Sequence, residues 1–224
     1  MRKFYLFFSA LFFSLMILSC TKKDEKPHIS IRDKVYNHQT ELHSVYKLKD
    51  VKIVMLGNSI TQGVNWNELL SYDKIANRGI SRDITSKFLL RLDNIISISP
   101  KYCFIMGGIN DLYDDIPVET VFANYSKIVN RLIDNNIIPV IQSTLFVSPQ
   151  WKRHIEKNEE VAKLNSLLKK LALEKDLIYL NVNSVLSDGY ALIDEYTTDG
   201  VHLNAEGYKL WGAALEKIIF ELDL

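Results

Sequence analysis

The chain has 224 residues, of which 47% are hydrophobic, and its 27 basic and 27 acidic side chains cancel to a formal net charge of zero. This length and apolar content suffice for one domain with a substantial core, which excludes a disordered tail. The balanced charge gives no reason to expect a nucleic-acid-binding protein or long-range attraction of a strongly charged polymer.

The first twenty residues have the pattern of an export signal. Two basic residues, at positions 2 and 3, precede an apolar run over residues 4–18, and Cys20 follows shortly after. This order is typical of a secretory signal peptide, and the run is too short for a comfortable transmembrane helix. Residues 17–20, ILSC, resemble the lipobox of bacterial lipoproteins. The resemblance implies cleavage before Cys20, lipidation of that cysteine and a membrane-anchored protein of the cell envelope, on its periplasmic or outer-membrane side. An ordinary cleaved signal and an uncleaved anchor are the alternatives.

Residues 21–50 are predicted to be a tether and N-terminal extension, ahead of a folded domain over residues 51–224. The segment begins with charged residues and a proline at 22–27 and shows no apolar periodicity. Short strand or packing segments are expected at 29–31 and 45–46.

Three histidines fall in this extension: His28, His38 and His43. Because neither cysteines nor paired carboxylates accompany them at ligand spacing, we expect surface histidines and no metal site. With Cys20 lipidated, Cys103 would be the only other cysteine, so no disulfide is expected in the mature chain.

The stretch VKIVMLGNSIT, residues 51–61, organises the folded domain. Its apolar run ends in Gly57, Asn58 and Ser59, which predicts a buried strand over 51–56, a sharp turn and then a helix. A serine just after a parallel strand lies at the rim of the sheet, where open α/β folds bind ligands, so Ser59 is a candidate nucleophile. The alternative is that Ser59 only caps the following helix.

From there apolar strands alternate with amphipathic helices. Strands are predicted at 74–77, 102–106, 137–143 and 177–181, and helices at 66–71, 84–98, 117–135, 156–174 and 205–221. Uninterrupted apolar strands alternating with helices indicate a parallel sheet covered on both faces, a three-layer α/β/α sandwich.

Two further stretches carry polar residues to the same rim. The strand at 102–106 is followed by GGIND, which places Asn110 beside the position expected for Ser59. Near the C-terminus, Asp199 precedes His202 by three residues, so in a helical or turn conformation the two side chains share a face. A serine hydrolase needs a nucleophile, a base, an orienting acid and oxyanion donors, and all four roles have candidates here.

Taken in order, the blocks GNSIT (57–61), NRGIS (77–81), GGIND (107–111) and DGVH (199–202) resemble the SGNH hydrolases, also called GDSL esterases. The resemblance implies the flavodoxin-like five-strand order and makes 51–224 the catalytic domain. It implies Ser59 as nucleophile, His202 as base and Asp199 as its orienter. It also implies an oxyanion hole formed by the backbone N–H groups of Ser59 and Gly79 and the side chain of Asn110, with no cofactor and no metal.

One position departs from the family pattern, because Asn58 stands where the family often has aspartate. This position is outside the triad, so we expect altered hydrogen bonding around the turn and retained chemistry.

The substrate is less well defined by the sequence. Four aromatic residues near strand ends are candidates for contact with it, although such residues more often pack in cores: Trp66, Tyr113, Phe146 and Trp151. No long apolar lid segment follows the predicted rim, which favours a short acyl group. The resemblance suggests an O-acetyl esterase acting on carbohydrate. The alternatives are a lysophospholipase or acyl thioesterase with the same triad, and a tethered glycan-binding protein without activity.

Overall fold

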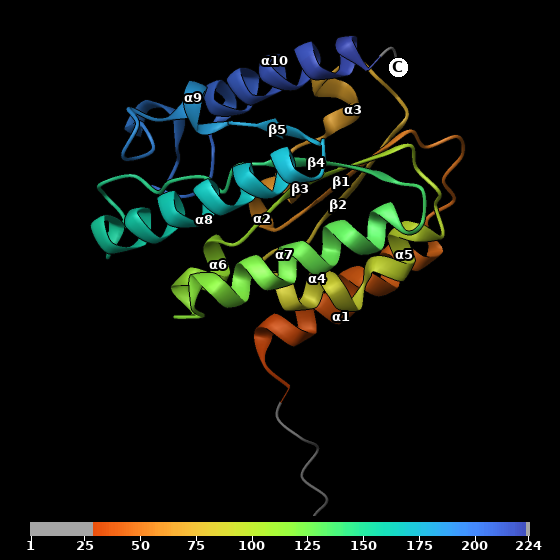
Figure 1. The fold of residues 1–224 in the computed structure, drawn as a ribbon, viewed down its shortest axis with the longest axis horizontal. Helices are drawn as coiled ribbons and strands as arrows, with labels where there is room; N and C mark the ends of the chain where they lie inside the picture. Colours follow the sequence, from red (N-terminus) through yellow and green to blue (C-terminus); the bar gives the residue numbers. More distant parts are fainter. Residues whose placement is uncertain (1–28, 223–224) are drawn as a thin grey trace, which may run out of the picture.

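The computed structural model describes residues 29–222, so the predicted signal peptide, the predicted lipidation site Cys20 and His28 lie outside the described residues. A five-stranded, all-parallel sheet forms the centre of the fold, with the strand order β2-β1-β3-β4-β5 (Figure 1). The strands are β1 (Ile53–Gly57), β2 (Ile75–Gly79), β3 (Tyr102–Met106), β4 (Ile138–Gln142) and β5 (Ile178–Leu180). The predicted flavodoxin-like α/β fold is confirmed.

Helices cover both faces of this sheet. In Figure 1, α3 (Trp66–Leu69) and α10 (Ala205–Glu221) lie on one side, and α4 (Thr85–Leu90), α5 (Leu92–Ile96) and α7 (Val118–Ile133) lie on the other. Helix α8 (His154–Glu174) packs beside α7. Short elements complete the rim: α2 (Ser59–Gln62), α6 (Ile109–Tyr113), α9 (Asn183–Leu186) and the 3₁₀ helix η1 (Asp194–Tyr196).

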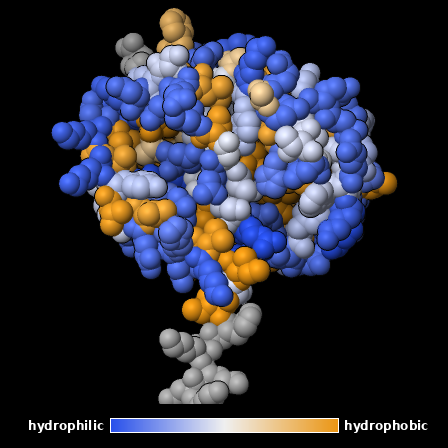
Figure 2. All heavy atoms as spheres, turned by 180° about the vertical axis from the view of Figure 1, so that it is seen from behind, coloured by the Kyte–Doolittle hydropathy of each residue, from blue (hydrophilic) through white to orange (hydrophobic). Residues whose placement is uncertain are grey.

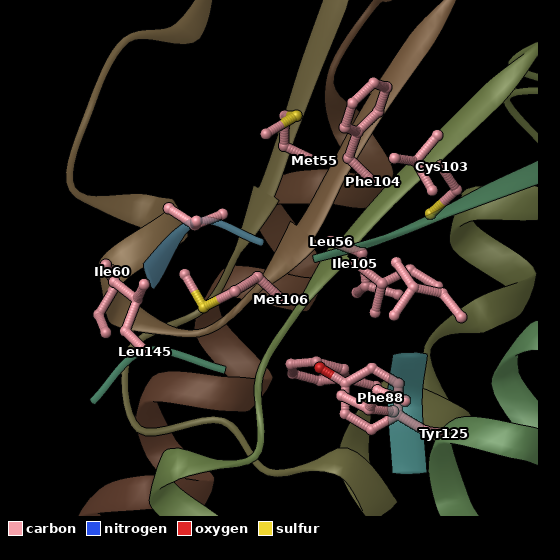
Figure 3. Close-up of a cluster of buried hydrophobic side chains, with 14 of the residues drawn as sticks. Met55, Leu56, Ile60, Phe88, Cys103, Phe104, Ile105, Met106, Tyr125 and Leu145 are labelled. Atoms are coloured by element: carbon pink, nitrogen blue, oxygen red, sulfur yellow. The ribbon is translucent and has the colours of Figure 1, made fainter. Parts of the chain in front are cut away.

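The core is built from the two central strands. Every residue of β1 and β3 is buried. Because successive side chains of a strand point to opposite faces, each strand contributes to both layers. Figure 3 shows Met55 and Phe104 on one side of the strands and Phe88 and Tyr125 together on the other. This two-sided burial explains why these strands are apolar throughout.

The predicted helix over 84–98 is two helices, α4 and α5, which meet at Arg91. The Arg91 side chain is buried, pairs with Asp83 at 2.8 Å, and donates to the carbonyl oxygens of Arg78 at 2.7 Å and Gly57 at 3.0 Å. The guanidinium thereby joins the ends of β1 and β2, and the backbone at Arg91 leaves helical geometry to place it there. Apolar periodicity does not reveal such a contact.

The N-terminal extension also differs from the prediction. Residues Ile31–Val45 form the helix α1, where a tether was expected with short strand or packing segments at 29–31 and 45–46 only. The side chain of Ser30 caps the helix by accepting from the Asp33 N–H. His43 is only 8% exposed, so the prediction of a surface histidine is wrong there, whereas His38 is exposed as predicted. The helix has its own partners on the domain, because Lys87 pairs with Asp33 and the Tyr36 hydroxyl donates to the Lys87 carbonyl.

The surface is mostly hydrophilic on the face opposite that of Figure 1, with hydrophobic groups scattered between the polar ones (Figure 2). Across residues 29–222, no helix combines the length and the apolar character needed to span a bilayer.

Candidate active site

The candidate site lies where the strands end, as expected for an open parallel sheet. Ser59 is the first residue of α2, directly after β1. Asn58 is the N-cap, and its Oδ1 accepts the N–H of Ile60 at 3.0 Å, so the amide supplies the same acceptor that an aspartate would. Gly57 permits the tight turn, because a Cβ there would lie 1.9 Å from Thr61 Oγ1.

Three of the predicted site residues form a continuous hydrogen-bonded chain. Ser59 Oγ lies 3.0 Å from His202 Nε2, and His202 Nδ1 lies 2.7 Å from Asp199 Oδ2. The other carboxylate oxygen, Asp199 Oδ1, accepts the backbone N–H of His202 at 2.8 Å. The ring therefore has a carboxylate on one nitrogen and a hydroxyl on the other.

Local contacts hold the loop that carries His202 and Asp199. The backbone carbonyl of His202 accepts from the Thr198 N–H at 2.9 Å and from Thr197 Oγ1 at 2.7 Å. Burial raises the pKa of the Asp199 carboxyl, but hydrogen bonds from the His202 ring and from the N–H groups of His202 and Val201 outweigh it and hold that pKa below its usual range. The carboxylate is therefore ionised at neutral pH, as an imidazole partner requires.

Asn110, in the first turn of α6, lies at the same rim. One of its side-chain N–H groups donates to the carbonyl of Asp83 at 2.9 Å, and an amide nitrogen has a second N–H to offer. The N–H of Ser59 is also available, since the first N–H groups of a helix have no acceptor one turn earlier. Both groups belong to residues that line one cavity with His202.

The structure does not bring Gly79 to this cavity. Its N–H donates to Asn77 Oδ1 at 2.8 Å, and a Cβ at this position would lie 2.3 Å from the Gln62 N. The glycine is needed because the backbone after Ser59 packs directly against it. The expectation of an oxyanion donor at Gly79 is therefore replaced by a structural role for that residue.

Arg82 is the residue that sequence reasoning missed. It lines the cavity, and its backbone is in the left-handed region with φ of 64°. The N–H of neighbouring Ser81 donates to Gln62 Oε1 at 2.8 Å, whereas no acceptor for the Arg82 N–H is found within residues 29–222. Arginine rarely adopts the left-handed backbone conformation, so its presence at position 82 did not predict a turn of this kind.

A buried carboxylate supports the floor of the site. Asp111, next to Asn110, is fully buried and accepts from the Thr85 N–H at 3.0 Å and the Thr85 hydroxyl at 2.5 Å. Burial raises the pKa of Asp111 to about 6, although the bonds from Thr85 oppose the shift. The first turn of α6 is thus tied to the start of α4.

The cavity measures about 490 Å³. Of the four aromatic candidates, Tyr113 and Trp151 line it, with their rings edge to face at 6.4 Å. Trp66 is a core residue, 1% exposed and packed against Trp211, and Phe146 lines a different hollow. Within the described part of the chain, no group of three or more His, Cys, Asp or Glu side chains is arranged to hold a metal ion.

Comparison with known proteins gives two kinds of match. The chain is 25% identical over 177 residues to N-acylneuraminate cytidylyltransferases of Streptococcus agalactiae, across 78% of this chain and 40% of the relative. The chain thus spans less than half the length of these curated relatives. Among solved structures, a GDSL-like lipase from Bacteroides thetaiotaomicron superposes with a TM-score of 0.70 at 24% identity, over 84% of this chain and 98% of that one. An acetylxylan esterase from Geobacillus stearothermophilus gives a TM-score of 0.66 at 15% identity, over 77% and 95%.

Sequence similarity at the family level covers most of the folded domain. Residues 55–210 match the model of the GDSL-like lipase/acylhydrolase family, a stretch that runs from β1 into α10 and contains every residue of the hydrogen-bonded chain described above. The protein therefore belongs to the GDSL-like lipase/acylhydrolase family, the SGNH hydrolases.

Proposed function

We propose that this hydrolase removes short acyl groups, acetyl foremost, from carbohydrate esters through a Ser59–His202–Asp199 triad. The observation that carries the proposal is the hydrogen-bonded chain from Ser59 Oγ through the imidazole to the Asp199 carboxylate, at 3.0 and 2.7 Å. A hydroxyl is a weak nucleophile until an adjacent base accepts its proton, and this chain supplies the base and its orienting acid.

In the proposed reaction, His202 Nε2 takes the proton of Ser59 Oγ as the oxygen attacks the ester carbonyl carbon. Asp199 accepts the hydrogen bond of Nδ1–H, which keeps Nε2 free to act as the base. When the tetrahedral intermediate collapses, the alcohol leaves with the proton from His202. A water molecule then gives its proton to His202 and attacks the acyl-enzyme, which releases the acid and restores Ser59.

The negative charge on the former carbonyl oxygen needs donors. We propose the backbone N–H groups of Ser59 and Arg82 together with the side chain of Asn110. These three belong to residues on the wall of one cavity, and Asn110 is held in place by its bond to the Asp83 carbonyl. A preorganised donor of this kind contributes roughly 10²–10³ in rate.

The choice of a short acyl group rests on the cavity walls. Most of the residues that line the cavity around Ser59 have charged or polar side chains, and the aliphatic residues among them are Ile109 and Val201. A more apolar hollow of about 530 Å³ borders the N-terminal part of α8, but none of its lining residues also lines the Ser59 cavity. A long acyl chain attached at Ser59 would therefore contact only these two aliphatic side chains in the cavity lining.

The choice of carbohydrate rests on aromatic residues and on the relatives. Tyr113 and Trp151 line the cavity, and aromatic rings of this kind offer flat apolar faces with a polar edge. The names of the relatives point the same way, since one acts on N-acylneuraminate, an acylated acidic sugar, and one structural neighbour is an acetylxylan esterase. The acetylated alcohol is therefore proposed to be a sugar hydroxyl.

The test is hydrolysis of p-nitrophenyl esters of increasing chain length by the purified protein, beside Ser59→Ala and the matched control Ser86→Ala on the exposed surface of α4. We expect turnover of the acetate that is lost in Ser59→Ala and retained in Ser86→Ala, followed by release of acetate from acetylated glycans. Rates that rise with chain length would instead favour a lysophospholipase or thioesterase. Folded protein without serine-dependent turnover would leave a tethered glycan-binding protein.

A further inference from the structure

The cavity around Ser59 is lined by more basic than acidic side chains, in a chain whose total charge is zero. Its lining contains four cations, Arg32, Arg82, Lys152 and Arg153, and one acidic residue, Asp114. Which of these cations can attract a ligand depends on whether an acidic side chain already pairs with it. Charge gathered at one cavity concentrates ligands of opposite sign there, even without a net charge on the protein.

Two of these cations already have acidic partners. Arg32, from α1, forms a two-pronged pair with Asp114, one bond of which measures 3.0 Å. Arg153, at the start of α8, pairs with Asp115 at 2.7 Å and with Glu156 at 2.6 Å. Because acidic partners already neutralise both guanidinium groups, neither is expected to bind an anionic substrate strongly.

Arg82 and Lys152 are different. Both are exposed, and neither has an ion-pair partner among residues 29–222. They come from opposite parts of the rim, Arg82 from the loop after β2 and Lys152 from the loop after β4. The backbone carbonyl of Lys152 accepts a hydrogen bond from the Tyr113 hydroxyl at 2.8 Å, which fixes the Lys152 backbone at the cavity wall. This bond leaves the Lys152 ammonium group able to bind an anion.

We propose that Arg82 and Lys152 bind a carboxylate on the alcohol part of the substrate, so that the preferred substrates are acyl esters of acidic sugars. This inference rests on the proposed esterase function and adds the charge of the leaving alcohol to it. The carboxylate belongs to the alcohol because a short acyl group held at Ser59 has no room for a second functional group. The Arg82 backbone N–H would donate to the oxyanion, and the Arg82 guanidinium would bind the carboxylate of the same substrate.

The test compares two acetyl esters that differ only in charge, O-acetylglucuronate and O-acetylglucuronamide, with acetate release as the readout. We expect kcat/KM for the glucuronate to exceed that for the amide by about tenfold at low salt, since each solvent-exposed charge contact contributes up to roughly fivefold. Raising the salt concentration should bring the two values together, because exposed charges are screened.

The variants Lys152→Gln and Arg82→Gln should each lower that ratio by roughly two- to fivefold, with a larger loss in the double variant. The matched control is Lys127→Gln, an exposed cation on α7 away from the cavity, which should leave the ratio unchanged. The ratio is the readout because it cancels any change in folded fraction or in the chemical step.

The failure of this inference is distinguishable from failure of the esterase proposal. Equal kcat/KM for the two sugars, with turnover that still depends on Ser59, would overturn the carboxylate site and leave the esterase intact. A ratio that persists unchanged in the double variant would also overturn it. Absence of serine-dependent turnover on both sugars and on p-nitrophenyl acetate would remove the esterase and this inference together.

Discussion

His202 and His43 show how surroundings set the behaviour of one side-chain type. His202 lies at the cavity, with its side chain 44% exposed, between the Ser59 hydroxyl and the Asp199 carboxylate. His43 lies at the end of α1 and is 8% exposed. Burial, followed by the positive charges of Arg78 and Arg91, lowers the pKa of His43 to about 3.

The difference teaches that a carboxylate and access to solvent make an imidazole useful for proton transfer, whereas burial among cations keeps it neutral. A histidine beside an ionised carboxylate can be protonated and deprotonated during a reaction. Protonation of a histidine beside two guanidinium groups is disfavoured by electrostatic repulsion between the positive charges. Substitution of His202 and its partners should therefore change the rate of ester hydrolysis, whereas substitution of His43 should change the free energy of unfolding.

The largest effect expected is on His202. Replacing it with glutamine removes the proposed base and should lower kcat by about 10⁴-fold or more, because triad members act as a unit. His43→Gln is the matched variant and should retain turnover per folded molecule. Steady-state rates on p-nitrophenyl acetate, with a thermal melt of each variant, make the measurement. Comparable rates for His202→Gln and the unchanged protein would contradict the assignment.

Asn110→Ala should lower turnover per folded molecule by roughly 10²–10³-fold, because it removes one oxyanion donor. If Asn110 merely satisfies the Asp83 carbonyl, the variant will melt at a lower temperature but keep its rate. Asn130→Ala, at an exposed position on α7, is the matched control. Rates divided by the concentration of folded protein, together with a thermal melt of each variant, separate the two outcomes.

Asp111 should make the protein less stable as pH rises. Its pKa is raised from 3.8 to about 6 in the folded state, so the folded protein holds this proton more tightly than the unfolded chain does. The resulting stability is present below pH 4 and is lost as pH rises through 6, by about 2 kcal/mol between pH 4 and 7.

Asp111→Asn should remove that contribution, because an amide does not ionise. Urea unfolding of both proteins at pH 4 and pH 7 gives the difference directly. An identical pH dependence in the two proteins would show that Asp111 ionises in the folded state as it does in the unfolded chain.

An effect of about the same size, with the opposite sign, is expected at His43. Its folded-state pKa is lowered to about 3, so the unfolded chain takes up a proton first as pH falls below the usual histidine range. Stability is therefore lost on acidification, by about 2 kcal/mol at pH 5. His43→Gln should lose less stability between pH 7 and pH 5 than the unchanged protein, measured by urea unfolding. An unchanged slope would mean that α1 does not bury His43 in solution.

The sequence by itself determined the features that depend on neighbouring residues. Apolar runs of strand length ending in glycine and polar residues predicted the five strands and placed Ser59 and Asn110 at strand ends. Asp199 and His202 are three residues apart, so one loop brings them together. The strand order needed the family resemblance, because periodicity does not encode which strands are neighbours.

Tertiary structure decided the features that depend on distant residues. Arg91 interrupts the helix predicted over 84–98 because its guanidinium reaches the Gly57 carbonyl on another strand. Gly79 packs against the backbone of Gln62 and donates its N–H to Asn77, whereas the Arg82 N–H has no acceptor among residues 29–222. The polar residues of the extension over 21–50 did not predict that α1 packs on the domain and brings Arg32 to the cavity. In each case the deciding contact joins residues far apart in sequence, and local pattern carries no information about it.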